Sequence, residues 1–277
     1  MIQEKHYGEI SRFDLSRNFP GRWRYWTTAY WVDGILVDTG CAHTAEELLR
    51  ELSEKSLLKI VNTHSHEDHI GANGLLQRSR PGLEIFAHPL ALPVLEDPQG
   101  AQPLNRYRHL FWGMPEPSHG LPLQDDQIIE AEYHQFQVIY TPGHGLDHIC
   151  LYEPRQRWLF TGDLFVGGKD RALRADFDIW MIIDSLKRIA ELPIDKLFPG
   201  CARVRDNPQE DIKVKIAYLE DLGGRALELH SRGWSTNSIA RSFPKGPTFL
   251  ELLTLGHFSR RSLVRSFLQK TTTQVDE

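Results

Sequence analysis

Short apolar runs separated by polar turns occupy the first two thirds of the chain. Residues 25–32 and 35–38 are two such runs, and the Asp33-Gly34 pair between them is a dipeptide that tight hairpins favour. Similar runs, each followed by a turn or a polar residue, lie at 57–61, 83–87, 136–140, 157–161 and 196–199. Runs of this length with such boundaries predict buried β-strands.

Helical spacing of apolar residues appears between and after these strands. Residues 45–52 show it after Thr44, a plausible N-cap, and residues 179–192 place Ile182, Ile183, Leu186 and Ile189 on one face. Residues 89–113 contain several prolines, and we predict that they form broken helices and a lid.

The composition changes at Asn207-Pro208, and the rest of the chain is predicted to be helical. The expected helices are 212–222, 225–232, 236–242 and 258–268. We therefore divide the chain into a domain at 1–206 and a small helical, winged-helix-like extension at 207–277. Residues 211–277 carry ten Lys and Arg against seven Asp and Glu, a net +3 that is modest for a nucleic-acid footprint. This favours a covering role for the extension over DNA binding.

The amino-acid composition limits the class of protein, its partners and its cellular location. A chain of 277 residues that is 40% hydrophobic and 25% charged has the composition of a globular protein. Its net charge of −5 argues against nucleic acid as the main partner. Three cysteines without paired spacing, no export signal at the N-terminus and no membrane-length apolar run together predict a cytoplasmic protein without a membrane partner.

The densest group of potentially reactive side chains in the sequence is a block of three imidazoles and a carboxylate. His64, His66, Asp68 and His69 fall within six residues, directly after the apolar run at 57–61. Side chains two residues apart in an extended or tightly turning segment point the same way, so His64 and His66 can bind one ion while Asp68 and His69 face another. Imidazole nitrogen and carboxylate oxygen bind zinc-type ions directly. The block therefore predicts a metal centre on a strand-to-helix loop.

Three later strands end in the same way. Apolar runs followed by a Gly or Pro turn lead to His144, Asp163 and Cys201. One such residue alone is usually part of a turn. Four strand exits of this kind in one chain indicate that the side chains meet at one edge of a sheet.

These motifs together resemble the metallo-β-lactamase superfamily of binuclear metallohydrolases. The matching segments are Asp38-Thr39-Gly40, the 64–69 block, Thr141-Pro142-Gly143-His144 and Thr161-Gly162-Asp163, within residues about 25 to 201. The resemblance implies an α/β (α+β) fold, a four-layer αββα sandwich, followed here by the C-terminal helices.

The resemblance also implies roles for individual residues. One metal ion would be held by His64, His66 and His144. A second would be held by Asp68 and His69, with Asp163 bridging the two ions. Asp38 would orient a ligand from outside the first coordination shell.

The chain departs from the family pattern at Cys201. The family usually has a histidine there, after a strand that ends in Pro-Gly. Three interpretations stay open at this position: a thiolate ligand, a spectator beside a weakly bound second ion, or an inert buried thiol. The departure affects the expected binding of the second ion and does not affect the ligands of the first.

The implied function is metal-dependent hydrolysis of an ester-like bond by a metal-bound hydroxide, with a thioester or lactone as substrate. Two Zn²⁺ ions are expected, with Fe or Mn as substitutes, and Asp68 would hold or shuttle a proton. Trp23 and Tyr25 are predicted to wall the pocket for a small-molecule substrate.

Two alternatives belong to other functional classes. One is a single-iron sulfur dioxygenase-type oxidoreductase, which weak binding at a second site near Cys201 would suit. The other is a metal-binding regulator whose C-terminal helices contact DNA. The sequence does not name the substrate, and self-association as a homodimer stays open.

Overall fold

The computed structural model describes residues 1–17, 25–244 and 248–269. The chain divides into two compact units. The first, which we call the sandwich unit, comprises Met1–Tyr140, Leu146–Val166 and Pro193–Asn207. The second, the helical unit, comprises Thr141–Gly145, Gly167–Leu192 and Pro208–Glu277. The predicted domain boundary between residues 206 and 207 stays a prediction.

One sheet of the sandwich unit has seven strands in chain order. Its strands are β1 (Ile2–Tyr7), β2 (Ile10–Leu15), β3 (Thr27–Val32), β4 (Ile35–Val37), β5 (Lys59–Val61), β6 (Glu84–Ala87) and β7 (Gly120–Pro122). The first four strands pair antiparallel, and the pairs from β4 to β7 are parallel. The predicted hairpin at Asp33-Gly34 is present between β3 and β4, with both residues at positive φ.

The second sheet has six strands in the order β14-β13-β11-β10-β9-β8. They are β8 (Ile128–Glu130), β9 (Gln135–Tyr140), β10 (Ile149–Glu153), β11 (Trp158–Gly162), β13 (Lys196–Pro199) and β14 (Arg205–Asp206). Only the β11–β13 pair is parallel. The predicted strands at 136–140, 157–161 and 196–199 therefore lie together in this sheet.

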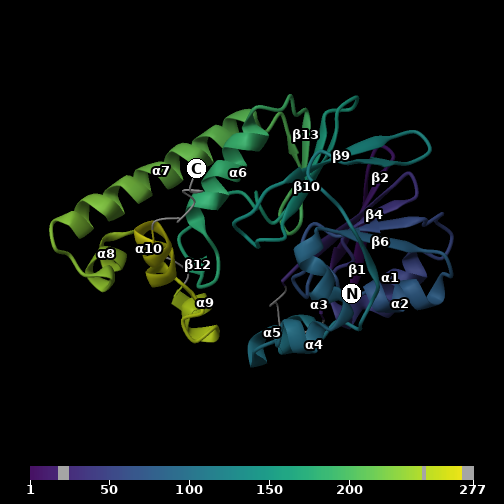
Figure 1. The fold of residues 1–277 in the computed structure, drawn as a ribbon, viewed down its shortest axis with the longest axis horizontal. Coiled ribbons are helices and arrows are strands. Elements are labelled where there is room, and N and C mark those ends of the chain that lie inside the picture. The colour runs from purple at the N-terminus through teal and green to yellow at the C-terminus, as the bar shows by residue number, and fades with distance from the viewer. Residues whose placement is uncertain (18–24, 245–247, 270–277) are drawn as a thin grey trace, which may run out of the picture. The chain divides into compact units, whose positions relative to one another are not determined.

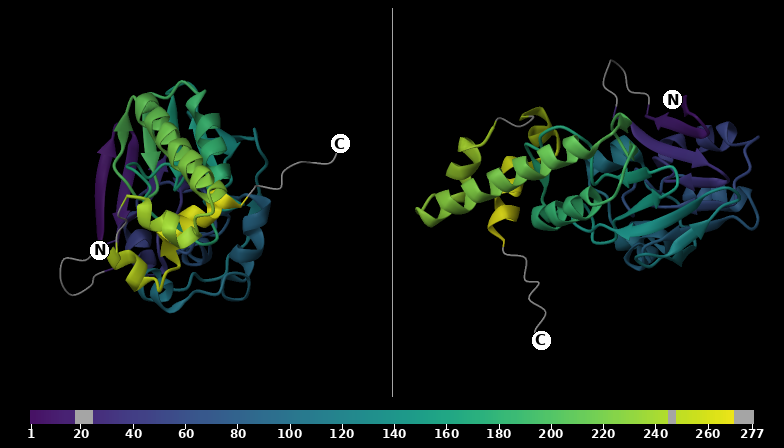
Figure 2. Two further views of the ribbon diagram at one scale, coloured as in Figure 1. Left: turned by 90° about the vertical axis from the view of Figure 1, so that its left-hand side faces the viewer. Right: turned by 90° about the horizontal axis from the view of Figure 1, so that it is seen from above.

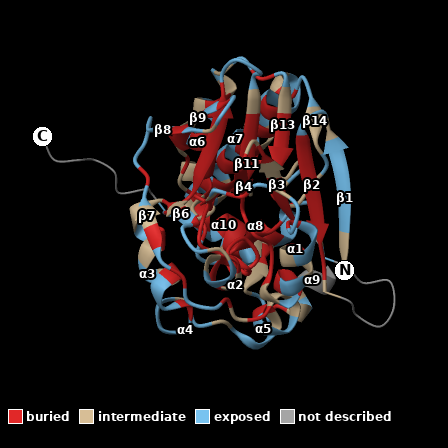
Figure 3. Ribbon diagram, turned by 90° about the vertical axis from the view of Figure 1, so that its right-hand side faces the viewer, coloured by how far each residue is buried: buried red, intermediate tan, exposed pale blue. Residues whose placement is uncertain are grey.

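Two apolar clusters stabilise the sandwich unit. One joins the facing sides of the two sheets, with Tyr30 and Val61 from the first sheet against Phe136, Phe160 and Phe198 from the second. Figure 3 shows how completely the central strands are buried, whereas β1 at the edge is largely exposed.

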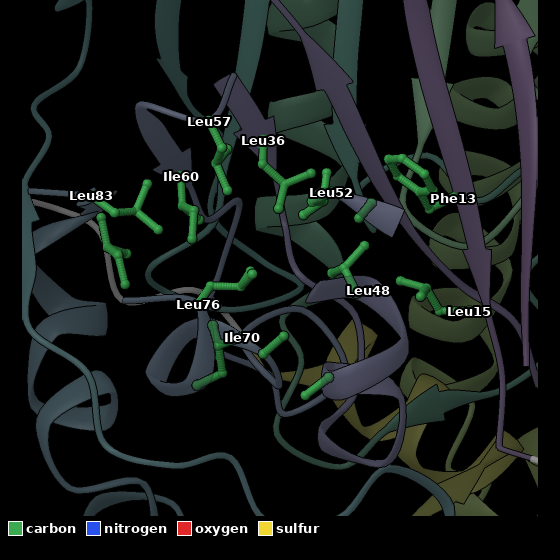
Figure 4. Close-up of a cluster of buried hydrophobic side chains, with 14 of the residues drawn as sticks. Phe13, Leu15, Leu36, Leu48, Leu52, Leu57, Ile60, Ile70, Leu76 and Leu83 are labelled. Atoms are coloured by element: carbon green, nitrogen blue, oxygen red, sulfur yellow. The ribbon is translucent and has the colours of Figure 1, made fainter. Parts of the chain in front are cut away.

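The second cluster lies between the first sheet and the helices that cover its outer face (Figure 4). Helices α1 (Ala45–Glu51), α2 (Asn73–Ser79) and α3 (Leu92–Glu96) contribute Leu48, Leu76 and Leu95 to it. The paired sheets and these helices confirm the predicted α/β sandwich class.

The segment predicted as broken helices is broken as expected. It contains η2 (Pro89–Ala91), α3, α4 (Pro98–Ala101) and α5 (Arg106–Trp112). The Asp97 side chain caps α4 and the Asn105 side chain caps α5, so each short helix begins at a polar residue that satisfies its first amides.

The helical unit contains α6 (Ile179–Ala190), α7 (Gln209–Ser231), α8 (Thr236–Ser242), α9 (Thr248–Leu253) and α10 (Arg260–Leu268), with a short β12 (Leu173–Arg174) and β15 (Phe258–Ser259) pair. Within this unit α6 lies beside α7, and α10 contacts both (Figures 1 and 2).

Helix α7 is continuous where the sequence predicted two helices. The prediction placed a break at Gly223-Gly224, but a Cβ at position 223 would lie 2.8 Å from the Trp180 ring and 3.1 Å from the Phe267 ring. Gly223 therefore serves close packing of α6 and α10 against α7, and this packing outweighs the low helix propensity of glycine.

A buried imidazole between two carboxylates gives the sandwich unit a pH dependence. His134 lies 3.1 Å from Glu9 in the β1–β2 turn and 3.4 Å from the fully buried Glu153 at the end of β10. Burial lowers the pKa of His134, but the neighbouring carboxylates of Glu9 and Glu153 outweigh this effect, so the pKa lies above the ordinary value.

A raised pKa means that protonated His134 stabilises the fold below the unfolded-state pKa of about 6.5, and that this contribution is lost as pH rises through the folded-state value. We expect His134→Gln to lower the melting temperature more at pH 6 than at pH 9. Thermal unfolding of both proteins across this range checks it, and an equal difference at all pH values would contradict it.

Candidate metal centre

The histidine block lies on the loop that leaves β5, and backbone hydrogen bonds to neighbouring segments hold this loop in place. The amide of Asn62 donates to the carbonyl of Phe86, that of Thr39 to His69, and that of Gly71 to Gly40. A Cβ at position 71 would lie 2.2 Å from the amide nitrogen of Ala42, so only glycine fits there. The loop is therefore packed directly on the 38–42 turn.

Asp38 links this turn to the ligand loop. Its carboxylate accepts hydrogen bonds from the Thr63 amide at 2.7 Å and the Thr63 hydroxyl at 2.8 Å, and it lies 2.7 Å from His69 Nδ1. Asp38 has φ of 59°, a left-handed conformation that aspartate tolerates better than most residues. A carboxylate at Nδ1 keeps the proton there, which turns Nε2 of His69 toward the site.

His64, His69 and Asp163 form a compact group in the sandwich unit. Each offers a ligating atom, and these atoms all lie within 4.8 Å of one another. His69 Nε2 is 3.6 Å from Asp163 Oδ2, too far for a hydrogen bond, and makes none among the described residues. A fully buried imidazole nitrogen without a hydrogen bond is unfavourable unless a further group binds it, and a metal ion would do so.

Glycines allow the separate strand ends to approach this group. Asp163 follows β11 directly, and Gly200 follows β13. A Cβ at Gly200 would lie 2.7 Å from Asp163 Oδ1 and 2.8 Å from His69 Cε1. Gly200 therefore leaves the space in which the two side chains meet.

His66 and Asp68 lie on the same loop. The ring of His66 is edge-on to that of His64, with centroids 4.5 Å apart. Burial raises the pKa of Asp68 to about 7; His69 opposes this shift, whereas Glu67 and Asp163 add to it. Asp68 belongs to no group of three ligating atoms within 4.8 Å in the part of the chain that the structure describes.

The protonation of His69 follows from its neighbours. Burial lowers its pKa, but the carboxylates of Asp38, Asp163 and Asp68 outweigh this effect and raise the pKa well above the ordinary value. Without a metal ion, a proton therefore supplies the positive charge that these carboxylates require.

Cys201 lies beside Asp163 and Tyr25. Burial and Asp163 raise the pKa of its thiol well above the ordinary value, and a hydrogen bond with Tyr25 opposes this. The Tyr25 ring also packs edge-on against Trp112, with centroids 5.4 Å apart. The Tyr25 side chain thus lies beside Cys201, and its role as a pocket wall stays a prediction. Trp23, the other predicted wall residue, lies outside the described residues.

His144 belongs to the helical unit. Its ring packs on Phe177 with centroids 4.2 Å apart, and the adjacent Gly143 carbonyl accepts a hydrogen bond from the Asp178 amide. The chain on both sides of its five-residue loop belongs to the sandwich unit, where the Tyr140 hydroxyl donates to the carbonyl of Leu146 at 2.8 Å.

Two residues that bond the segments carrying the proposed ligands were not predicted as site residues. Asp147 accepts a hydrogen bond from the Ser65 amide at 2.8 Å, and His148 Nε2 accepts one from the Asp163 amide at 3.2 Å. The sequence signal was a His-x-x-Asp-His spacing after Gly143, which resembles part of the 64–69 block but gives no indication of the partners.

Comparison with known proteins gives a consistent picture. The sequence profile described as the metallo-beta-lactamase superfamily matches residues 27–201. A hydroxyacylglutathione hydrolase of Legionella pneumophila (strain Paris) is 30% identical over 173 residues, 61% of this chain and 57% of that protein. An atrochrysone carboxyl ACP thioesterase of Aspergillus fumigatus is 26% identical over 67% of this chain and 52% of that protein. The chain thus spans little more than half the length of these relatives.

Among solved structures, a protein crystallised in a di-iron-bound form is 30% identical, with a TM-score of 0.57 over 72% of this chain and 96% of that one. No described helix has both the length and the apolar character needed to cross a membrane.

Proposed function

The chain belongs to the metallo-β-lactamase superfamily, and from this premise we propose that it is a metal-dependent hydrolase of thioesters. The observation that carries the proposal is the buried group of His64, His69 and Asp163, whose ligating atoms lie within 4.8 Å of one another. Neutral imidazole and carboxylate at this spacing suit a zinc-type or iron ion.

We assign the residues as follows. His64, His66 and His144 would hold one ion, and His69, Asp68 and Asp163 would hold a second, with Asp163 contributing to both. When bound, the ions supply an activated water and Lewis-acid stabilisation of the developing negative charge. Two ions, zinc as the metal, a cytoplasmic location and the division at residue 206 belong to the proposal.

The protein's own side chains prepare this chemistry. Asp38 holds the proton of His69 on Nδ1 and so keeps Nε2 available as a ligand. Burial raises the pKa of Asp68 in the metal-free protein, and we assign Asp68 the role of holding or shuttling a proton. Tyr25 places a hydroxyl beside Cys201, where it can donate a hydrogen bond to a substrate oxygen.

Thioesters are favoured over lactones by the two relatives. One is a hydroxyacylglutathione hydrolase and the other an acyl-carrier-protein thioesterase, and both names describe cleavage at a thioester carbonyl. The di-iron-bound relative supports iron as the alternative metal. The sulfur dioxygenase-type activity and the DNA-contacting regulator stay predictions from the sequence.

Turnover of a substrate panel tests the proposal. Protein loaded separately with Zn²⁺, Fe²⁺ or Mn²⁺ would be assayed on acyl-glutathione and acyl-pantetheine thioesters, lactones and phosphodiesters. We expect thioesters to be hydrolysed fastest, EDTA to lower the rate by on the order of 100-fold or more, and added metal to restore it. Undiminished turnover by metal-free protein, or no thioester hydrolysis with any of the metals, would overturn the proposal.

A further inference from the structure

A buried ion pair joins the ligand loop to α5. Glu67 lies between His66 and Asp68 in the histidine block, and its side chain is 1% exposed. Arg108 of α5, 8% exposed, donates from Nε to Glu67 Oε1 at 2.7 Å and from Nη2 to Glu67 Oε2. The guanidinium thus occupies both carboxylate oxygens, so Glu67 is not arranged as a metal ligand.

A second contact ties the same segment to the loop. The Gln102 side-chain amide donates to the carbonyl of Ser65 at 2.8 Å, and its Oε1 accepts a hydrogen bond from Arg108 Nη2 at 3.2 Å. Ser65 and Glu67 alternate with His64, His66 and Asp68 along the loop. The residues between the proposed ligands are therefore the ones that the 102–108 segment holds.

A buried carboxylate next to Asp68 is costly unless it is paired. A buried ion pair stabilises a fold weakly compared with apolar packing, and in some proteins such a pair fixes one arrangement over others. Here the pair fixes a loop that brings further carboxylates and imidazoles together. An apolar pair of similar volume would pack in this place but would not fix the loop in one arrangement.

We propose that Arg108 and Gln102 are positioning residues of the metal centre, which hold the 64–69 loop in its metal-binding shape through Glu67 and Ser65. The inference rests on the proposed metal-dependent function. It identifies the segment predicted as a lid as a support of the ligand loop. Groups that support metal ligands from outside the first coordination shell commonly change metal affinity by 10–100-fold when they are replaced.

Metal affinity of the full chain tests this assignment. Zn²⁺ binding would be measured by competition with a chromophoric chelator, together with thermal unfolding, for the wild type, Arg108→Gln, Glu67→Gln and the double variant. We expect each single variant to bind Zn²⁺ about 10–100-fold more weakly. The double variant, whose two amides can hydrogen bond without a buried charge, should lie between the singles and the wild type.

Arg12→Gln is the matched control. Arg12 also forms a buried pair with Asp14 in β2, with Nε 2.6 Å from Oδ1 and side chains 8% and 7% exposed, and no contact described for it involves the 64–69 loop. Its replacement should lower the melting temperature and leave Zn²⁺ affinity unchanged.

The outcomes separate the two proposals. A wild type that binds no metal ion would remove the proposed function itself. If the wild type binds Zn²⁺, a folded Arg108→Gln protein that loses no more affinity than Arg12→Gln overturns the positioning role. Should the single variants fail to fold, the double variant decides: weaker binding than the wild type supports the role, and equal binding refutes it.

Discussion

Replacing His66 with alanine is expected to lower thioester hydrolysis by on the order of 10³-fold, which corresponds to about 4 kcal/mol of transition-state stabilisation. A bound metal ion supplies several kcal/mol of such stabilisation. His66 is buried within the block, with its ring edge-on to that of His64, and alanine removes the nitrogen that we assign as a ligand. Steady-state turnover and metal content of the purified variant measure the two effects together.

His119→Ala is the control for this substitution. The His119 side chain is 76% exposed and belongs to neither metal-binding group among the described residues. The control should keep both its turnover and its metal content. Retention of near wild-type turnover by folded His66→Ala protein would show that the block is not the catalytic centre.

The second large effect is expected at Asp38. Asparagine has nearly the same shape and also tolerates positive φ, so Asp38→Asn should fold. The amide nitrogen of asparagine cannot accept a hydrogen bond from His69 Nδ1. Where that nitrogen donates to Nδ1 instead, the proton of His69 moves to Nε2, the atom that faces the metal centre. We therefore expect metal affinity to fall by about 10–100-fold. The melting temperature should change less than it does in Asp14→Asn.

Chelator competition and thermal unfolding of Asp38→Asn provide the measurement. Asp14→Asn is a suitable comparison, because Asp14 is also a buried carboxylate but bonds Arg12 and Lys5 in the first sheet. That variant should lose stability and keep its metal affinity. If Asp38→Asn and Asp14→Asn bind metal equally well, Asp38 does not orient His69.

The sequence predicted those features that depend on local spacing. The 64–69 block indicates a metal centre because its residue types have few other uses at this density, and the Asp33-Gly34 hairpin follows from turn chemistry alone. The continuity of α7 through Gly223 was missed, because the reason for that glycine lies in Trp180 and Phe267, far away in the sequence.

Contacts between distant segments were beyond prediction for the same reason. Arg108 lies 41 residues after Glu67, and no periodicity connects an arginine in a short helix with a glutamate in a loop. The strands β1 and β2 were also missed: β2 contains Arg12 and Asp14, charged residues that are buried only because they pair with each other. Buried ion pairs weaken the alternation of apolar and polar residues on which strand prediction depends.

The most direct test is an anomalous-diffraction structure of crystals grown from Zn²⁺-loaded protein. The account predicts one ion in contact with His64, His66 and His144, and a second in contact with His69, Asp68 and Asp163. The same map shows whether Cys201 Sγ is a ligand of the second ion. An ordered structure in which His64, His66 and His144 are too far apart to contact a common ion would contradict the account.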